Sequence, residues 1–410
     1  MAASRQGARL ALLLLTALAA AAQAGQVRLV SHNLLNYPGS TGAARAPHFQ
    51  TVLAAAAPDL LLVQEMLGQS GVDQFLAQVL EPLAPGAWSA APFHDGFDTD
   101  RALFLRADCA SVLAAGWLDT ALRDIDWWDL RLAASGDTLR VYNLHLKASQ
   151  GSSEEQRRYE ECLVLRASLD ALPAGRAVLV CGDFNLYTAA EPAWQLLRSP
   201  GPGQLFDPLA AEGAWHDNPA FATVHSQSTR TSDFGGGATG GLDDRFDFLL
   251  PGAALLDGLG LELEPASYLT LGNDGAHLNL SIVTGVNGAV SAEVAQALHE
   301  ASDHLPLCVD LSWSESTAVA ELPTAARLDV WPNPFNPTTR LRFRLPLAGP
   351  ARLEIFDPQG RRVARLFAGE APAGSLAVDW QAGSLPAGLY LAILSQDGRP
   401  VARSKLVLLR

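Results

Sequence analysis

Short apolar runs alternate with stretches of helical periodicity over the first three-quarters of the chain. The apolar runs predict strands at residues 26–30, 60–63, 102–105, 139–144, 177–181, 246–250 and 305–311. Helical spacing predicts helices over residues 49–57 and 72–80, and over residues 153–172, which Pro173 follows. Strands interleaved with helices indicate an α/β domain in which helices cover the sheets.

The pattern changes after residue 313. Residues 314–327 are mostly small and polar, which is typical of a linker. Beyond them, short β-type runs separated by turn residues lie at 339–345, 351–356, 363–367, 376–380, 389–395 and 404–409. This regular spacing predicts a small all-β sandwich of antiparallel strands over residues 328–410.

The N-terminus has the features of a secretory signal. Arg5 and Arg9 precede an apolar run over residues 10–22, and Ala22-Gln23-Ala24 is a small-residue cleavage site. We therefore expect residues 1–24 to be removed and the protein to be secreted or held at the cell surface. The alternative is a retained membrane anchor, although the run is short for a bilayer. No later stretch is long and apolar enough to be a transmembrane segment.

The net charge of −14 is unevenly divided along the chain. Residues 25–313 contain 15 Lys/Arg and 35 Asp/Glu, a net of −20, whereas residues 328–410 contain 11 and 6, a net of +5. An acidic body repels polyanions, which argues against tight, unassisted binding of duplex nucleic acid. Bound divalent cations would offset part of this charge locally.

The four cysteines have no C-x-x-C spacing, and three of them, Cys162, Cys181 and Cys308, lie inside apolar runs. Such cysteines usually act as small buried hydrophobic side chains. We expect free, buried thiols; a single disulfide is the alternative that export permits.

Polar side chains recur at or near the ends of the predicted strands. They are Asn33, Glu65, His145, Asp183, Asn185, Asp247, Asp303 and His304. An ionised carboxylate beside a buried strand is unfavourable unless it is paired or bound to metal. If these groups converge, they form a hard-oxygen site suited to Mg²⁺, Mn²⁺ or Ca²⁺ and less suited to zinc. Each residue alone also has a simpler interpretation, as a turn or cap aspartate or a hydrogen-bonded core histidine.

Taken in order, these motifs resemble the endonuclease/exonuclease/phosphatase superfamily. The resemblance rests on Asn33, the run from Pro58 to Glu65, Asn143-Leu-His-Leu146, Gly182-Asp-Phe-Asn185, Arg245-Phe-Asp247 and Ser302-Asp-His-Leu-Pro306. It covers residues 26–313, which we take as the catalytic domain. It implies a four-layer α/β sandwich of two packed mixed sheets flanked by helices, with the site at one rim of the sheets.

The same resemblance implies roles for individual residues. Glu65 would bind the metal, helped by Asn33 and Asp303, and Asp183 would orient and deprotonate the attacking water. Asn185 would hold a phosphate oxygen. His304, oriented by Asp247, would bind the phosphate or assist proton transfer. His145 matches the second acid/base of the deoxyribonuclease and sphingomyelinase branches and would also contact the phosphate.

Arg230 lies in the stretch 224–230, which resembles secreted bacterial members of this superfamily with unassigned substrates. It could contact the substrate phosphate, or it could anchor a loop through a salt bridge.

The C-terminal segment resembles a second family. Trp331-Pro-Asn-Pro-Phe-Asn-Pro337, Ile355-Phe-Asp-Pro-Gln-Gly360 and Leu385-Pro-Ala-Gly-Leu-Tyr390 are similar to type IX secretion sorting domains and their flagellar-hook-capping, immunoglobulin-like relatives. The resemblance implies that bacterial secretion and sorting machinery is a partner. The alternative is a spacer sandwich, because this architecture serves many roles.

The residues, together with these resemblances, imply a secreted, divalent-metal-dependent phosphoesterase, most simply a nuclease, and we expect a monomer. A sphingomyelinase-type or inositol-phosphate-type enzyme acting on lipid or small-molecule phosphoesters is the alternative, mildly favoured by the acidic body. A non-catalytic surface protein that retained the fold is the third hypothesis.

Overall fold

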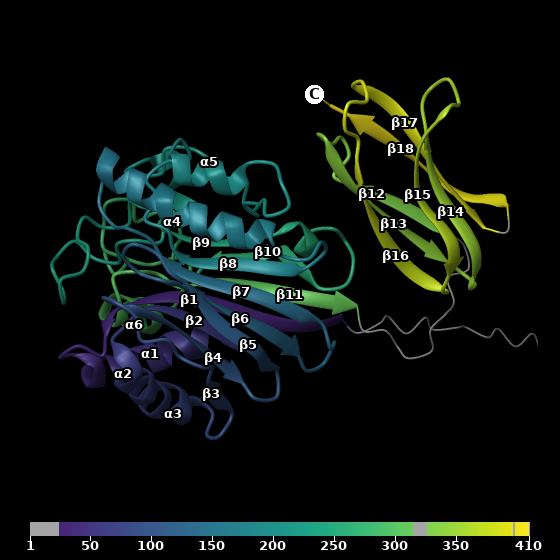
Figure 1. Ribbon diagram of the computed structural model, residues 1–410. Helices are drawn as coiled ribbons and strands as arrows, with labels where there is room; N and C mark the ends of the chain where they lie inside the picture. Colours follow the sequence, from purple (N-terminus) through teal and green to yellow (C-terminus); the bar gives the residue numbers. More distant parts are fainter. Residues whose placement is uncertain (1–23, 315–325, 397, 410) are drawn as a thin grey trace, which may run out of the picture.

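Two mixed β-sheets form the centre of the N-terminal part of the computed structural model, which describes residues 24–314, 326–396 and 398–409 (Figure 1). The first sheet has the order β10-β11-β1-β2-β4-β3 and the second has the order β5-β6-β7-β8-β9. The first contains β1 (Ala24–Tyr37), β2 (Leu60–Met66), β3 (Trp88–Ala90), β4 (Asp100–Arg106), β10 (Glu262–Thr270) and β11 (Leu307–Ser314). The second contains β5 (Ala110–Leu118), β6 (Ile125–Leu132), β7 (Thr138–His145), β8 (Ala177–Asp183) and β9 (Asp247–Pro251).

Helices cover the outer face of each sheet, as Figure 1 shows. On the side of the first sheet lie α1 (Gly42–Ala56), α2 (Gly68–Phe75), which continues as a π-helical turn (Leu76–Leu80), α3 (Glu81–Leu83) and α6 (Ala292–Ala301). On the side of the second sheet lie α4 (Ser152–Asp170) and α5 (Pro192–Arg198). Short 3₁₀ turns occur at Pro219–Val224 and Ala253–Leu255.

The alternation of apolar side chains along each strand produces these layers. In β1, Leu29 packs into the core between the two sheets, while its neighbour Val30 packs under the helices of the first sheet. In β8, Leu179 faces the other sheet and Val180 faces α4 and α5. Because successive strand residues point to opposite faces, near-continuous apolar runs are required of strands that are buried on both sides. The predicted four-layer α/β sandwich is confirmed.

Each of the seven predicted catalytic-region strands corresponds to an observed strand, and residues 49–57, 72–80 and 153–172 correspond to helical segments. Seven helices or strands of this part were not predicted: β3, β5, β6, β10, α3, α5 and α6. β5 and β10 are edge strands. Most of their residues are exposed or partly exposed, so their apolar pattern is weak. The glycine-rich stretch over residues 235–241 is a loop, as expected.

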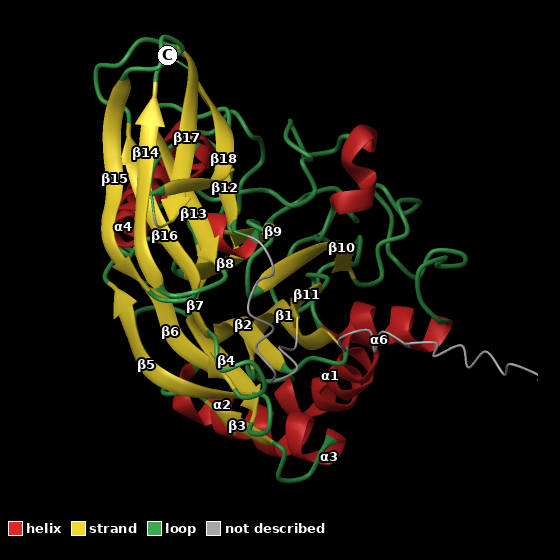
Figure 2. Cartoon of the chain, turned by 90° about the vertical axis from the view of Figure 1, so that its right-hand side faces the viewer, coloured by secondary structure: helices red, strands yellow, loops and turns green. Residues whose placement is uncertain are grey.

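The C-terminal part consists of antiparallel strands only (Figure 2). One sheet has the order β12-β13-β16 and the other β15-β14-β17-β18. The strands are β12 (Arg327–Trp331), β13 (Thr338–Leu345), β14 (Gly349–Phe356), β15 (Arg362–Ala371), β16 (Gly374–Gln381), β17 (Gly388–Gln396) and β18 (Arg399–Leu408). Both sheets contribute to one core, where Phe343 and Leu341 lie with Leu353 and Leu394. The predicted all-β fold is confirmed, and its relation to immunoglobulin-like sorting domains stays a prediction.

Several predictions concern the chain outside these sheets. The signal peptide and most of the linker, residues 1–23 and 315–325, lie outside the described residues, and the domain boundaries stay predictions. All four cysteines are free, with Cys162, Cys181 and Cys308 buried and Cys109 partly buried, as expected. Within the described ranges, we find no helix with the length and apolar character of a membrane span.

Gly182 offers a direct test of how β8 meets β7. Its φ is +129°, and a Cβ atom built on it would lie 2.0 Å from the carbonyl oxygen of Leu144 in β7. We expect Gly182→Ala to lower the free energy of unfolding by more than ~3 kcal/mol, because both the backbone conformation and the strand pairing must shift. Urea unfolding measures the change.

Gly136, in the turn between β6 and β7, is the matched control. It also has a positive φ of +73°, but no atom lies within 4 Å of a Cβ built on it. Gly136→Ala should therefore lower the free energy of unfolding by only about 1 kcal/mol. Equal losses in the two variants would show that the contact with Leu144 is unimportant.

Candidate active site

The predicted site residues meet at one rim of the two sheets. Asn33 in β1 and Glu65 in β2 come from neighbouring parallel strands of the first sheet, whereas Asp303 and His304 precede the antiparallel β11. In the second sheet, His145 in β7, Asp183 in β8 and Asp247 in β9 occupy paired positions on three adjacent strands. The end of one strand thus meets the start of its antiparallel neighbour, which collects residues that are distant in sequence.

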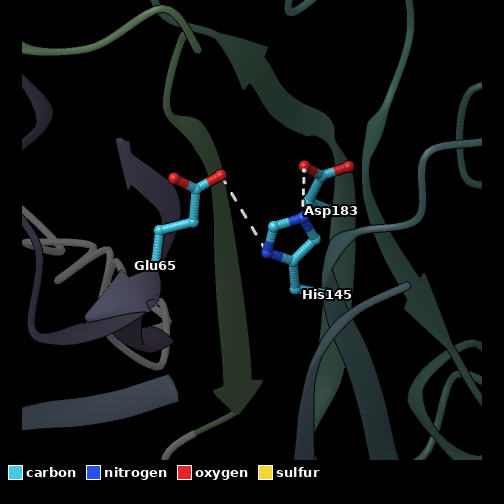
Figure 3. A group of neighbouring side chains, drawn as sticks. All are labelled: Glu65, His145 and Asp183. Atoms are coloured by element: carbon cyan, nitrogen blue, oxygen red, sulfur yellow. Dashed lines mark ion pairs between the residues drawn. The ribbon is translucent and has the colours of Figure 1, made fainter. Parts of the chain in front are cut away.

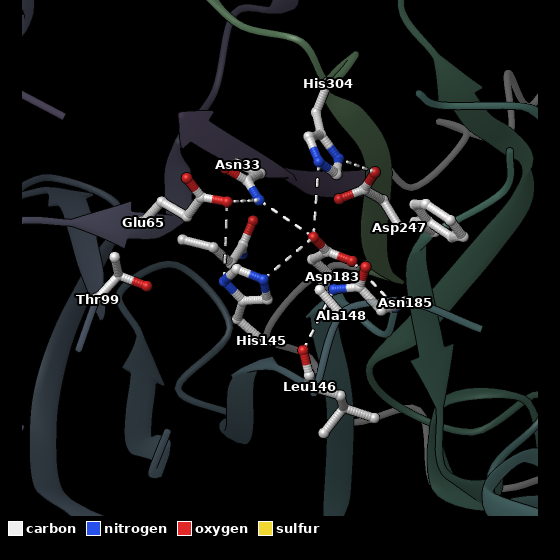
Figure 4. A network of polar contacts seen from close by, with 12 residues as sticks. Asn33, Glu65, Thr99, His145, Leu146, Ala148, Asp183, Asn185, Asp247 and His304 are labelled. Carbon is white, nitrogen blue, oxygen red and sulfur yellow. Dashed lines mark hydrogen bonds and ion pairs between the residues drawn. The ribbon is translucent and has the colours of Figure 1, made fainter. Parts of the chain in front are cut away.

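Asp183 is the centre of the contact network (Figure 4). Its Oδ2 accepts a hydrogen bond from the Asn33 side-chain nitrogen at 3.1 Å and lies 3.5 Å from His145 Nε2 and 3.6 Å from His304 Nε2. The same Asn33 nitrogen donates to Glu65 Oε1 at 2.9 Å. Asn33 therefore places one polar donor group between two carboxylates, and the Leu35 amide fixes the orientation by donating to Asn33 Oδ1.

His304 is held from its Nδ1 side by Asp247. Its Nδ1 lies 2.7 Å from Asp247 Oδ2, and that oxygen also accepts a hydrogen bond from the Ser226 hydroxyl at 2.6 Å. Burial alone would lower the pKa of His304, but the charges of Asp247, Asp183 and Asp303 outweigh it and raise the pKa well above its usual range. His304 is thus a protonated imidazole among carboxylates.

His145 lies between Glu65 and Asp183, as Figure 3 shows. Its Nδ1 lies 4.0 Å from Glu65 Oε1 and has no hydrogen-bond partner among the described residues. Burial, together with the positive charge of Arg123, lowers its pKa well below the usual range. Arg123 also donates to the carbonyl oxygens of His145 and Leu146. The site therefore combines one protonated and one neutral histidine.

Burial and mutual repulsion disfavour the charged carboxylates. Burial, with the charges of Asp247 and Glu65, raises the pKa of Asp183 to about 7, although His304 opposes the shift. Burial and the charge of Asp303 likewise raise the pKa of Glu65. Two neighbouring carboxylates that both resist ionisation are stabilised in the charged form by a bound cation.

The chemistry of the donors fits a divalent metal. Ligand atoms of Glu65, His145 and Asp183 all lie within 4.8 Å of one another. Two of the three donors are carboxylates, and His145 adds the unpartnered buried Nδ1 described above. Oxygen-rich sets of this kind suit Mg²⁺ or Mn²⁺, and the imidazole favours Mn²⁺ more than the sequence alone indicated.

Asn185 follows Asp183 in the turn after β8. Its backbone amide donates to Asp183 Oδ1 at 3.0 Å and its side chain donates to the Leu146 carbonyl at 3.2 Å. Its φ is +51°, and Glu65 has a φ of +59°. Left-handed backbone at two non-glycine residues of one site is unfavourable by ~1 kcal/mol or more each and often accompanies function.

Asp303 is held by the glycine-rich loop. The Ala238 amide donates to Asp303 Oδ2 at 2.6 Å, and a Cβ on the preceding Gly237 would lie 2.8 Å from that oxygen. The glycine at this position therefore permits the loop to approach the carboxylate closely. Among the described contacts, Asp303 acts on Glu65 through its charge and is not hydrogen-bonded to it.

Arg230 is not part of this network. It is buried, and its guanidinium lies 4.1 Å over the Phe234 ring, while Nε and Nη2 have no hydrogen-bond partner among the described residues. Its connection to the site is the charge of Asp303. A contact between Arg230 and substrate phosphate stays a prediction.

Three site residues were not singled out from the sequence: Ser226, Gln227 and Thr99. Gln227 Nε2 lies 2.5 Å from His304 Nε2 and donates to Asp303 Oδ2 at 3.2 Å. Thr99, drawn in Figure 4, is buried, and its Oγ1 has no hydrogen-bond partner in the described part of the chain. Polar residues in loops carry no periodic signal, so only the stretch 224–230 as a whole stood out.

No protein-family model matches the chain, and no curated protein matches its sequence. Among solved structures, it is similar to an endonuclease/exonuclease/phosphatase family protein from Bacteroides thetaiotaomicron, with 17% identity, a TM-score of 0.47, and coverage of 71% of this chain and 99% of that one. The human Nocturnin catalytic domain with bound sulfate shows 18% identity, a TM-score of 0.47, and coverage of 70% and 94%. A mannosyl-6-phosphatase from B. thetaiotaomicron shows 17% identity, a TM-score of 0.46, and coverage of 70% and 99%.

The contribution of Asp183 to the stability of the metal-free protein should fall as pH rises from about 4 to 7. The pKa of Asp183 is raised in the folded state from 3.8 to about 7, so the folded state binds more protons than the unfolded state between these values. The raised pKa of His304 acts in the same direction above pH 6.5. Asp183→Asn should therefore stabilise the metal-free protein at pH 8 by ~2 kcal/mol, and by much less at pH 4.

Thermal unfolding in the presence of a chelator, at a series of pH values, measures this difference. Adding Mn²⁺ at pH 8 should raise the melting temperature of the native protein but not that of Asp183→Asn. A variant that is no more stable than the native protein at pH 8 would contradict the crowding of charge at the site.

Proposed function

We propose that the protein is a divalent-metal-dependent phosphoesterase that hydrolyses its substrate by attack of water. The observation that carries the proposal is the arrangement around Asp183, whose carboxylate lies between a neutral and a protonated histidine and beside Glu65. A metal bound by Glu65, with Asp183 or His145, would stabilise negative charge that develops on the phosphate oxygens.

Asp183 is suited to take a proton from the attacking water. A base with a pKa near the working pH is the most effective, and the pKa of Asp183 is raised by burial to about 7. The Asn185 amide and the Asn33 side chain each hold one of its two oxygens, so the carboxylate is fixed in one orientation. Because the carboxylate is already oriented, it does not have to reorient during the reaction step.

The two histidines are suited to different roles because their charges differ. His304, protonated and oriented by Asp247, is suited to bind a negatively charged phosphate oxygen or to donate a proton to the leaving oxygen. His145 is neutral, so it is suited to accept a hydrogen bond or to bind the metal. Asn185, beside Asp183, adds an amide donor for a phosphate oxygen.

The charge of the catalytic region favours a small or lipid phosphoester over duplex nucleic acid. Residues 25–313 have a net charge of −20. A surface with this charge repels a polyanion over its whole length, whereas a small phosphoester meets only the site itself. A nuclease acting on short or single-stranded ends is the second candidate, because the same chemistry cleaves any accessible phosphodiester.

We also propose export of the protein and its sorting by bacterial secretion machinery. The proposal is supported by the signal-like residues 1–24 and by the motifs in residues 328–410 that resemble sorting domains. In this proposal, the C-terminal strands contribute to location and not to catalysis.

Hydrolysis of bis-p-nitrophenyl phosphate tests the chemistry. We expect turnover with Mg²⁺ or Mn²⁺ that is abolished by chelator and restored by adding metal. Asp183→Ala and His304→Ala should each lower kcat by 10²-fold or more, because each removes a group that contacts the reacting atoms.

Asp108→Ala is the control, since this aspartate is exposed and pairs with Arg106 at the surface. It should retain full activity. Turnover by Asp183→Ala at the native rate would overturn the proposal, as would activity unaffected by chelator.

A substrate comparison at two salt concentrations separates the two candidate substrates. We expect single-stranded oligonucleotides to be poorer substrates than sphingomyelin, inositol phosphates or sugar phosphates at low salt, and to improve as salt screens the repulsion. Strong hydrolysis of oligonucleotides alone, at low salt, would instead identify a nuclease.

A further inference from the structure

A cavity of about 350 Å³ lies between the N-terminal part and the C-terminal part of the chain. The N-terminal part lines it with residues from the segments that precede β8 and follow β9, and the C-terminal part lines it with residues of β12, β13 and β16. Figure 1 shows these strands on the side of the C-terminal part that is nearer the N-terminal part. The two parts therefore meet along one sheet of the C-terminal part.

Close side-chain contacts connect the two parts at this surface. The ring centroids of Phe206 and Trp331 lie 5.7 Å apart, and the Arg198 guanidinium lies over the Phe206 ring at 5.6 Å. Gly175 lies beside Arg340, since a Cβ atom built on the glycine would be 2.6 Å from Arg340 Nη1. The glycine therefore permits the guanidinium to approach the backbone of the N-terminal part closely.

The orientation of Arg340 is fixed by a partner in its own sheet. Its Nε and Nη2 donate to the two carboxylate oxygens of Asp379, at 2.8 Å and 3.1 Å. A bidentate pair of this kind has a specific geometry, and it leaves Nη1 beside Gly175. The C-terminal part thus presents a positive charge in a set position to the N-terminal part.

Charges of opposite sign line the two sides of the cavity, with Asp257 on one side and two arginines on the other. Oδ1 of Asp257 is buried and has no hydrogen-bond partner among the described residues. Burial raises the pKa of Asp257, and the positive charges of Arg342 and Arg340 oppose that rise. The net charges of residues 25–313 and 328–410, −20 and +5, have the same complementarity at long range.

The contact lies at the opposite end of β8 and β9 from the candidate active site. β8 starts at Ala177, just after Gly175, and ends at Asp183, whereas β9 starts at Asp247 and Asp257 follows its end. A strand advances about 3.3 Å per residue, so the length of β8 separates its two ends by about 20 Å. The C-terminal part, in contact here, leaves the rim with Asp183 and Asp247 uncovered.

We propose that the sheet β12-β13-β16 is a docking surface whose partner is the N-terminal part of the same chain, at the end of β8 and β9 remote from the candidate active site. The C-terminal part is then held in one orientation. Its attachment to a cell surface or to sorting machinery leaves the rim with Asp183 on the far side of the N-terminal part. The docking does not depend on the proposed function, whereas this consequence rests on it.

Small-angle X-ray scattering of the full chain tests the docking. Trp331→Ala removes the contact with Phe206, and Arg342→Glu replaces the attraction of Asp257 by repulsion. We expect the variant with both substitutions to have a radius of gyration larger than that of the native chain by about a tenth or more, because two separated bodies are less compact than one.

Arg352→Glu combined with Leu389→Ala is the matched control. It makes the same change of charge and removes an exposed apolar side chain, but on the other sheet of the C-terminal part, in β14 and β17. Its radius of gyration should equal that of the native chain. A native radius in the variant of Trp331 and Arg342 would overturn the proposal, and so would an equal rise in the control.

An exchange of charge tests the specific pair. Arg342→Glu alone should raise the radius of gyration, and adding Asp257→Arg should return it towards the native value, because the attraction is restored with the charges exchanged. An equal or larger radius after the exchange would contradict the pairing. If circular dichroism shows that a variant of Trp331 does not fold, Phe206→Ala removes the same ring contact from the other side and should give the same rise.

Hydrolysis of bis-p-nitrophenyl phosphate separates the docking from the proposed function. The variant of Trp331 and Arg342 should change kcat by less than about twofold, because distant sites with no shared contacts act independently. A larger fall would overturn the location of the docking surface away from the site. A native chain without activity, combined with the expected change in scattering, would refute the phosphoesterase and leave the docking intact.

Discussion

Repulsion among buried carboxylates is the constraint on which the site depends. Glu65, Asp183, Asp247 and Asp303 meet at one rim, and three of the four are at least 97% buried as whole residues. Without metal, two substitutes for a cation hold them together: the Asn33 amide between Glu65 and Asp183, and the protonated ring of His304 between Asp183 and Asp247. The raised pKa values of Asp183 and Glu65 show that these substitutes compensate only in part. The remaining charge is what a divalent cation would neutralise, so the affinity for metal and the instability of the metal-free site have the same origin.

The fold can hold such a site because the apolar contacts that pack the two sheets together do not involve the site residues. Leu29, Leu179 and their neighbours fix the two sheets face to face, and the pairing of β7, β8 and β9 then determines which side chains share the rim. Polar contacts reinforce the approach of the sheets near the site. Gln64 donates to Asn143 Oδ1 at 2.7 Å across the two sheets, and Arg101 in β4 pairs with Asp126 in β6, with both ionic groups buried. These pairs contribute alignment more than stability, because desolvation offsets most of their attraction.

The sequence predicted the residues on strands and missed those on loops, for a physical reason. Glu65 and Asp183 follow apolar runs whose burial made an unpaired carboxylate conspicuous, so their convergence could be anticipated from the order of the strands. The edge strand β5 lacked that contrast, since five of its nine residues are exposed and three more are partly exposed. Gln227 lies in a loop whose path depends on hydrogen bonds to two segments distant in sequence, and no local pattern encodes that path. The guanidinium of Arg230 packs over Phe234, a contact that no local pattern encodes, and its contact with substrate phosphate stays a prediction.

The loop residues are nevertheless organised by one repeated device, in which a buried hydroxyl ties one segment to the next. Thr229 donates to the carbonyl of Ser302 at 2.7 Å, and Ser302 donates to the carbonyl of Asn33 at 2.7 Å. Ser226 adds the bond to Asp247. All three hydroxyl residues are fully buried, and a buried hydroxyl is tolerated only when it is hydrogen-bonded. The chain of bonds therefore links the loop 226–229, the segment that precedes β11 and the metal-facing end of β1, which are the three segments that carry Gln227, His304 and Asn33. Removing one hydroxyl would leave its partner unsatisfied inside the protein, so the geometry of the histidine and that of the metal-binding carboxylates cannot vary independently.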